Sequence, residues 1–214
     1  MPHTEPYGEL FIVSAPSGVG KSTIIGKLLS AFPKLRFSVS STTRPARPSE
    51  TQGKDYHFLS VEEFSQGINS GRFLEWARVH SHFYGTDRDI VEKWLASGHD
   101  VLLDIDVQGT RQVRWAHPEA KTIFILPPSM EVLEERLRGR ATETEEQLVV
   151  RISAARREIL EASWYDYLIV NEDLQEAVQD LGAIVRACRS RSRVHSPVVK
   201  KLLISLVDST LSPK

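Results

Sequence analysis

A short glycine-rich loop near the N-terminus constrains the fold more than any other feature of this chain. Residues 15–22 have the sequence A-P-S-G-V-G-K-S, after an apolar run at 10–13 and before a helix-like segment at 22–31. This order of strand, turn and helix is the setting of a phosphate-binding P-loop. Gly18 and Gly20 allow successive backbone N–H groups to face an anion, and the helix start adds its positive dipole end. We prefer this interpretation to a plain connecting loop because strand, G-K-S and helix are in register.

The side chains of the loop have expected roles in holding a nucleoside triphosphate. Lys21 would reach the β- and γ-phosphates, and the hydroxyl of Ser22 would hold Mg²⁺. Ala15 stands where this motif usually has glycine, and its methyl group is tolerable if the residue keeps a negative φ. The predicted triphosphate-binding residues of this segment are Ala15, Pro16, Ser17, Gly18, Val19, Gly20, Lys21, Ser22 and Thr23.

Composition narrows the class of protein. A chain of 214 residues, 41% hydrophobic and 26% charged, is typical of one large globular domain. A net charge of −1 provides no general attraction to nucleic acid or to an anionic membrane. The single cysteine, Cys188, excludes an internal disulfide, suits a reducing cytosol and is expected to be a buried thiol. Residues 1–8 lack the features of a signal peptide, and no apolar run is long enough for a membrane span. We expect a cytoplasmic protein with a flexible N-terminus at 1–8 and no nucleic-acid or membrane partner.

The hydrophobic pattern predicts an α/β fold with a parallel β-sheet core flanked by helices. Short, continuously apolar runs predict buried strands at 10–13, 101–105, 122–126 and 167–170. Helical patterns are found at 22–31, 61–70, 88–97, 130–138, 144–162 and 174–189. In such sheets ligands bind at the carboxyl ends of the strands, where the P-loop lies.

Two stretches interrupt this alternation. Residues 37–88 contain short polar–apolar segments at 37–41, 56–59 and 73–79, which predict small antiparallel strands around one helix. Residues 136–157 form an arginine-rich helix–turn–helix pattern. Because no Pro/Gly/Ser-rich linker brackets them, we interpret both as insertions into a domain at 9–188, whose core is then 9–36, 89–135 and 158–188.

The C-terminal tail, 189–214, begins with R-S-R-S-R and continues with V-V-K-K-L-L-I-S-L-V at 198–207. This pattern predicts a basic turn followed by a short amphipathic helix. We prefer packing on the domain, or on a second subunit of a homo-oligomer, to nucleic-acid binding.

Arg44 and Arg47 are each followed by proline in S-V-S-S-T-T-R-P-A-R-P. Proline holds the preceding residue extended, so both guanidinium groups can converge on one phosphate with bidentate geometry. The alternative is two solvated surface arginines, and the pattern alone does not decide between them.

Acidic residues follow apolar segments at two places. Glu75 lies between Leu74 and Trp76, surroundings in which a carboxylate usually has a designated partner. That partner is either a structural cation or the donor-rich edge of a base. Asp104 and Asp106 end a buried strand and, two residues apart, would point to the same face. Paired acids beside a P-loop favour a role in binding a metal or orienting a hydroxyl over a structural one.

A third group of arginines lies in the 136–157 insertion. Phosphoryl transfer needs positive charge where the equatorial oxygens develop negative charge, and mobile arginines can supply it when a site closes. The arginines considered for this role are Arg136, Arg140 and Arg151. We assign Arg138, Arg156 and Arg157 to a solvated helix face, and Thr144 to the N-cap of the second helix.

With these pieces in order, the chain resembles the guanylate kinases from about residue 9 to residue 186. The motifs that carry the resemblance are S-A-P-S-G-V-G-K-S-T, S-V-S-S-T-T-R-P-A-R-P, G-K-D-Y-H-F, F-L-E-W-A, Y-G-T, L-D-I-D-V-Q-G, R-G-R-A-T-E-T-E-E and Y-L-I-V-N-E-D-L. The resemblance implies a P-loop core, a GMP-binding insertion at 37–88 and a lid at 136–157. It also implies Mg²⁺-dependent phosphoryl transfer from ATP to GMP.

The resemblance assigns roles to individual residues. It implies that Arg44, Arg47, Tyr56 and Tyr84 hold the GMP phosphate, and that Ser40, Glu75, Thr86 and Asp104 recognise guanine. It implies that Asn171 contacts adenine and that Ser22, Asp104 and Asp106 order Mg²⁺. The implied catalytic residues are Lys21, Arg44, Arg136, Arg140 and Arg151.

Departures from the family pattern affect no charged or hydroxyl group of the implied site. Ala15 and Ala141 stand where glycine is usual, and His82-Phe83 replaces a small or amide residue followed by an aromatic one. The alanine at 141 bears on the stiffness of the lid.

Two other functions are compatible with such a fold. One is a phosphopeptide-binding module that has lost catalysis, but such modules lose the P-loop lysine and lid arginines that this chain retains. The other is a kinase for a different small phosphorylated substrate. Ser40, Glu75 and Thr86 favour guanine over that alternative.

Overall fold

The computed structural model describes residues 7–79, 81–139, 145–191, 199 and 201–204. Its strands are β1 (Leu10–Ser14), β2 (Arg36–Phe37), β3 (Ser41–Thr42), β4 (His57–Phe58), β5 (Phe73–Val79), β6 (His82–Asp87), β7 (Val101–Asp104), β8 (Lys121–Leu126) and β9 (Tyr167–Val170). Its helices are α1 (Lys21–Ala31), α2 (Val61–Asn69), α3 (Arg88–Ala96), α4 (Val107–Ala116), α5 (Met130–Arg138), α6 (Glu145–Leu160), the 3₁₀ turn η1 (Glu161–Trp164) and α7 (Leu174–Arg189). None of the helices described is long and apolar enough to cross a membrane.

The core is a five-stranded parallel sheet in the order β2-β7-β1-β8-β9. This confirms the predicted parallel sheet and the positions of its four predicted strands. The prediction that all four are buried is wrong for β9, an edge strand in which only Ile169 is buried. The fifth strand, β2, was not expected here, because Phe37 was predicted to start an antiparallel strand of the insertion. Phe37 instead pairs in parallel with Leu102 of β7. A strand of two residues has too little alternation to indicate its partner.

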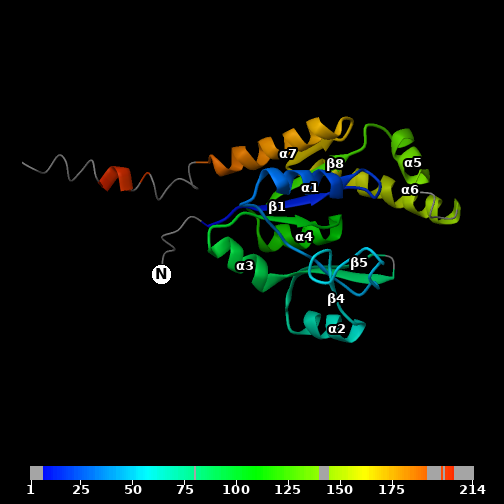
Figure 1. Cartoon of the computed structure of the whole chain (residues 1–214), viewed down its shortest axis with the longest axis horizontal. Coiled ribbons are helices and arrows are strands. Elements are labelled where there is room, and N and C mark those ends of the chain that lie inside the picture. The colour runs from blue at the N-terminus through cyan, green and yellow to red at the C-terminus, as the bar shows by residue number, and fades with distance from the viewer. Residues whose placement is uncertain (1–6, 80, 140–144, 192–198, 200, 205–214) are drawn as a thin grey trace, which may run out of the picture.

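Helices cover both faces of this sheet, which explains why its strands are apolar without alternation. In Figure 1, α1 and α7 lie on one side of β1, and α3 and α4 lie on the other. Residues such as Phe11 and Val13 pack toward α1 and α7, while Ile12 packs with Val91 of α3 and Val113 of α4. The predicted core is thus two apolar layers separated by one sheet. Cys188 of α7 belongs to the first layer and is 2% exposed, as predicted.

Helix α4 was not predicted. Its sequence, V-Q-G-T-R-Q-V-R-W-A, contains a glycine, a threonine and two valines, all of which are weak helix formers. The helix begins because Asp106 caps it, accepting a hydrogen bond from the N–H of Gly109 at 2.8 Å. Burial of Gly109, Thr110 and Val113 against the sheet supplies the rest of its stability.

The insertion folds as a second, four-stranded sheet in the order β4-β3-β6-β5, packed on α2. Pairs β3–β6 and β5–β6 are antiparallel as predicted, but β3 and β4 pair in parallel, so the prediction of antiparallel strands throughout is wrong. The long connection between β3 and β4 makes a parallel pair feasible. Phe64 of α2 anchors the helix, with ring centroids 4.3 Å from Phe73 and 5.5 Å from Phe83.

Helices α5 and α6 form the arginine-rich region. The predicted helix at 144–162 is shorter in the structure: α6 ends at Leu160 and continues as the 3₁₀ turn η1. The predicted roles of Arg140, Ala141 and Thr144 concern positions outside the described residues. Arg138 forms a two-pronged ion pair with Glu145, and Arg156 pairs with Glu134, in keeping with their assignment to a solvated face.

Candidate active site

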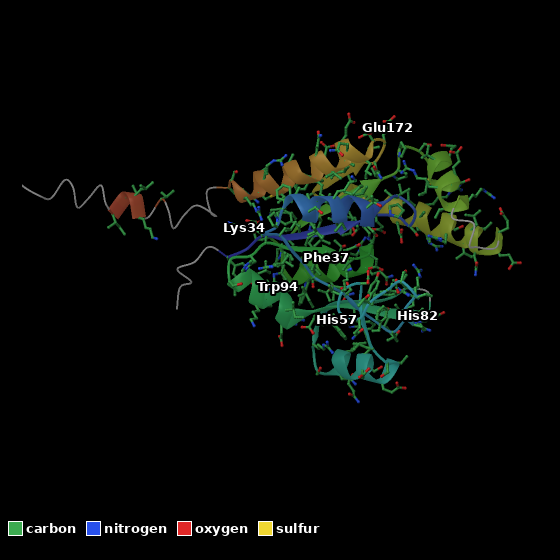
Figure 2. All side chains as sticks on the ribbon, viewed as in Figure 1. Lys34, Phe37, His57, His82, Trp94 and Glu172 are labelled. Carbon is green, nitrogen blue, oxygen red and sulfur yellow. The ribbon has the colours of Figure 1, made fainter. Side chains whose placement is uncertain are left out.

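A pocket of about 380 Å³ lies where the P-loop, the carboxyl end of β7 and the insertion sheet meet. The predicted residues that line it are Ala15, Pro16, Ser17, Gly18, Gly20, Lys21, Ser22, Thr23, Ser40, Tyr56, Glu75, Tyr84, Asp104 and Asp106. Figure 2 shows the side chains, with Phe37 on the core and with His57 and His82 marking the insertion below it. The pocket therefore brings together the predicted triphosphate-binding loop and side chains predicted from five separate motifs.

The P-loop has the backbone geometry that its glycines permit. Gly18 and Gly20 have φ values of 94° and 100°, in the left-handed region that side chains disfavour. A Cβ on Gly18 would also lie 2.7 Å from the side chain of Leu137 in α5. Gly20 is the N-cap of α1, and no side chain caps that helix. An uncapped helix start facing a pocket is suited to an anion.

Lys21 and Asp104 form an ion pair across the pocket at 2.5 Å. Lys21 begins α1 and Asp104 ends β7, next to β1 in the sheet, so the parallel strands place the two groups at the same edge. Asp106 lies just beyond β7 and caps α4 through Gly109, so part of its role is structural. The two acids line the same pocket, as their spacing predicted.

The donor set of the pocket fits a magnesium ion that arrives with a nucleotide. The described residues contain no group of three or more His, Cys, Asp or Glu side chains arranged to hold a metal. Mg²⁺ is commonly bound by one or two carboxylates together with substrate phosphates, rather than by a protein cage. The hydroxyl of Ser22 and the carboxylates of Asp104 and Asp106 are the oxygen ligands available here.

Side chains from α5, α6 and the segment after β9 form hydrogen bonds with the P-loop. Arg136 donates to the carbonyl oxygens of Val19 and Asn171, both at 3.3 Å. The side-chain amide of Asn171 donates to the same Val19 carbonyl at 2.6 Å. Arg151 donates to the hydroxyl of Ser17. Arg136 and Arg151 thus lie within reach of the loop, while Asn171 is 5% exposed and braces it.

Arg44 is held in place by an acid that sequence reasoning missed. Its guanidinium donates to Glu50 at 2.8 Å and lies over the ring of Tyr56, 5.4 Å from the centroid. Glu50 also accepts the backbone N–H of Arg47 at 2.8 Å. The bond from Arg44 is the main reason that the pKa of Glu50 is lowered. The side chain of Arg47 is exposed, so Arg44 alone of the two is positioned in advance.

Glu75 is a buried acid whose partner is a hydroxyl. Its side chain is 3% exposed, and it accepts a hydrogen bond from Thr86 at 2.6 Å across the β5–β6 pair. Burial raises its pKa to about 7, the Thr86 hydrogen bond opposes that shift, and the charge of Asp106 adds to it. Thr86 is fully buried behind it. The alternative of a structural salt bridge finds no support in the described residues.

Glu158 of α6 also lines the pocket and was not predicted. Burial is the main cause of its raised pKa, Lys21 lowers that pKa and Asp106 raises it. The sequence contained a signal that could have found it. Glu158 follows Arg151 by seven residues, so two helical turns place both side chains on one face of α6.

Comparisons with known proteins agree with this geometry. The family model described as guanylate kinase matches residues 7–188. The chain is 50% identical over 202 residues to the guanylate kinase of Idiomarina loihiensis, covering 92% of this chain and 96% of that one. It is 49% identical over 188 residues to that of Symbiobacterium thermophilum, covering 88% and 89%. The crystal structure of guanylate kinase from Anaplasma phagocytophilum superimposes with a TM-score of 0.75 at 36% identity, covering 88% of this chain and 90% of that one.

Proposed function

Because the chain belongs to the guanylate kinase family, we propose that it transfers the γ-phosphoryl group of ATP to GMP and releases ADP and GDP. The observation that carries this proposal is one pocket lined both by the P-loop and by the buried carboxylate of Glu75. The first binds a triphosphate, and the second can accept hydrogen bonds from a base.

On the donor side, the P-loop residues 15–23 would hold the phosphates of ATP. Lys21 would leave its ion pair with Asp104 for the β- and γ-phosphates. Asn171, next to the loop, would contact adenine. Ser22, Asp104 and Asp106 would hold Mg²⁺, and the ion would offset the negative charge of the phosphates.

On the acceptor side, the insertion 37–88 would bind GMP. Tyr56 and Tyr84 line the pocket with ring centroids 6.0 Å apart, and Arg44 lies against Tyr56. With Arg47 they would hold the phosphate of GMP. Guanine offers N1–H and N2–H₂ donors side by side, a pattern that adenine lacks. The groups that would recognise guanine are Ser40, Glu75, Thr86 and Asp104.

The transfer step needs no protein nucleophile. A phosphate oxygen of GMP attacks the γ-phosphorus in line, and the bond from that phosphorus to the bridging oxygen of ADP breaks. The negative charge that spreads over the equatorial oxygens would be neutralised by Lys21 and by the lid arginines Arg136, Arg140 and Arg151. Arg151 already contacts the P-loop through Ser17.

A coupled assay of ADP production tests this proposal. GMP, AMP, UMP and CMP are supplied in turn as acceptors, with ATP and Mg²⁺. We expect turnover with GMP, and a kcat/KM for AMP lower by about a thousandfold or more, because AMP leaves the Glu75 carboxylate unpaired. Equal rates with GMP and AMP would contradict the assignment of guanine.

The protein is expected to act in the cytoplasm. The observation in support is that the chain has a single cysteine and so cannot form an internal disulfide, which suits a reducing compartment.

We also infer that the chain self-associates through its tail at 189–214. In the described part of the tail, Val199, Leu203 and Ile204 are each about half exposed or more. Apolar side chains so exposed are suited to an interface. Sedimentation velocity should show a smaller species for the variant carrying Leu203→Asp and Ile204→Asp than for the parent or for Lys201→Gln. The same sedimentation coefficient in all three would contradict the inference.

A further inference from the structure

We propose that Gly109, in the first turns of α4, is a specificity-determining residue because its missing side chain makes the space that the Glu75 carboxylate occupies. Gly109 belongs to neither the P-loop nor the insertion, and it is not among the residues that line the pocket. It would act through Glu75, as a positioning residue. This inference rests on the proposed recognition of guanine by Glu75.

The distances leave no room for a side chain at position 109. A Cβ built on Gly109 would lie 2.4 Å from Oε2 of Glu75 and 3.0 Å from its carboxyl carbon. Nonbonded carbon–oxygen contacts of that length are strongly repulsive, so one of the two groups would have to move. The same Cβ would lie 3.4 Å from the carboxylate of Asp106, an ordinary contact. A methyl group at this position would therefore displace Glu75 and leave Asp106 in place.

The backbone gives no other reason for a glycine here. Gly109 lies in an α-helix and is not among the glycines with positive φ. Alanine is intrinsically preferred to glycine in a helix, so this glycine carries a propensity cost. Close approach of the Glu75 carboxylate accounts for that cost.

Glu75 is fixed on its other sides and cannot retreat easily. Its Oε1 accepts the Thr86 hydroxyl at 2.6 Å, and Thr86 is fully buried. If the Glu75 carboxylate moved toward the protein interior, this hydrogen bond would break and the buried Thr86 hydroxyl would be left unpaired. The route that remains leads into the pocket, where guanine would bind.

Strand β5 cannot slide away either, because α4 holds it one residue further on. Gln112 lies one turn after Gly109, and its amide donates to the carbonyl of Trp76 at 2.7 Å. Its side-chain oxygen accepts the N–H of Trp76 at 3.2 Å. The two bonds fix the distance between α4 and β5 beside Glu75. Helix α4 thus sets the position of the carboxylate in two ways: Gly109 leaves space for it, and the hydrogen bonds of Gln112 to Trp76 hold β5 beside it.

The test compares Gly109→Ala with Gly26→Ala in the full chain. Gly26 lies in α1, and a Cβ there meets nothing within 4 Å, so it is the matched control for a glycine-to-alanine change in a helix. For Gly109→Ala we expect kcat/KM for GMP to fall by about tenfold to a hundredfold, mainly through KM, with a narrower GMP/AMP ratio. The KM for ATP should stay within about twofold of the parent. Gly26→Ala should match the parent in kcat/KM for GMP, in the GMP/AMP ratio and in the KM for ATP.

A double-mutant cycle with Glu75→Asp makes the steric cause explicit. Aspartate is one methylene shorter and withdraws from the methyl group at position 109. We expect Gly109→Ala with Glu75→Asp to lose less activity toward GMP than the product of the two single losses. If Gly109→Ala does not fold but the double variant does, the clash is confirmed. Independent effects, or failure of both to fold, would overturn the proposal.

A separate arm distinguishes failure of this inference from failure of the proposed function. Glu75→Gln should narrow the GMP/AMP ratio if Glu75 recognises guanine. If it keeps the parental ratio, the assignment of guanine recognition is wrong. If Glu75→Gln narrows the ratio and a folded Gly109→Ala keeps it, only the role of Gly109 is refuted.

Discussion

Folding and guanine recognition make opposite demands on Glu75. The carboxylate is 3% exposed, and desolvation is the main reason that its pKa rises to about 7. Since the ordinary value is 4.5, the folded protein binds a proton here that the unfolded chain releases over the interval between them. The stability that this protonation contributes is present below about pH 4.5 and is lost as the pH rises through about 7. Ionised Glu75 is thus costly to the fold and useful to the site.

Glu75→Gln should stabilise the protein at high pH. At about pH 8 the variant removes a buried charge and keeps an acceptor for Thr86, so its free energy of unfolding should exceed the parent's by up to about 3 kcal/mol. At about pH 5 the difference should shrink to less than about 1 kcal/mol. Urea unfolding at the two pH values measures this difference in the free energy of unfolding. The control is Glu172→Gln, the same substitution at an exposed position. A difference independent of pH would show that the carboxylate is not the cause.

A substitution of Lys21 should affect catalysis without affecting the stability of the fold. It is partly exposed and paired with Asp104, which is also partly exposed, so its loss leaves no deeply buried charge. We expect Lys21→Ala to lower kcat by on the order of a thousandfold and to leave the circular dichroism spectrum unchanged. Lys27→Ala, on the exposed face of the same helix, should retain the parental kcat. Retained turnover in folded Lys21→Ala would refute the role of the P-loop lysine.

Among the elements, the sequence predicted best the four long strands of the parallel sheet, three of which are largely buried. Strands β1, β7, β8 and β9 are within about a residue of their predicted bounds because continuous apolar runs have few alternative uses. Helix α4 escaped prediction because a cap and burial, not propensity, stabilise it. The parallel pairing of β3 with β4 depends on the tertiary fold, which two-residue strands cannot encode locally.

The site divides in the same way. The P-loop, Asp104 and Glu75 were predictable because each belongs to a local motif with its own chemistry. Glu50 and Gly109 were not, because each acts on a site residue through a contact made by folding. Glu158 was predictable from its spacing of seven residues after Arg151 on one helix, but this signal was not used. The contact between Gly109 and Glu75 joins residues 34 apart in the sequence. Such partners require knowledge of which elements pack together.

A substitution in helix α2 can show whether the insertion can be destabilised without an effect on ATP binding by the P-loop. Phe64 is fully buried and stacks on Phe73 and Phe83, so it joins the helix to β5 and β6. Phe64→Ala should lower the free energy of unfolding by about 3 to 5 kcal/mol. The KM for GMP should rise, while the KM for ATP, set by the core, changes little. Chemical unfolding and steady-state kinetics give the two quantities, and Val61→Ala at an exposed position of α2 is the control. Equal increases in both KM values would contradict a separable insertion.

On the scale of the whole molecule, the groups proposed to act in one transfer step are spread over the core, the insertion and the region of α5 and α6. In Figure 1 the insertion with α2 and β5 lies below the core, and α5 and α6 lie at its end. Tyr56 and Tyr84 line the pocket, but the side chain of Arg44 pairs with Glu50 and that of Arg47 is exposed. Transfer in line requires the phosphate-binding groups to converge and water to be excluded. The arrangement therefore favours closure of the insertion and the lid over the core.

The contact between α4 and β5 indicates how such a closure can proceed. Gln112 holds Trp76 to α4, so the contact at Trp76 should act as the hinge about which the insertion, with α2 packed on it, rotates. We expect the radius of gyration from small-angle scattering to decrease when GMP and a non-hydrolysable ATP analogue are both bound. GMP alone should produce only the part of the decrease that belongs to the insertion, because the region of α5 and α6 is expected to close only when the ATP phosphates are bound. The variant Gln112→Leu nearly keeps the volume of the side chain but removes both hydrogen bonds to Trp76. Without nucleotides, the position of the insertion relative to the core should therefore vary more in this variant than in the parent, and the KM for GMP should be higher. A radius of gyration that is the same with and without both nucleotides would rule out closure, and the arginines would then have to reach the phosphates by side-chain rotation alone.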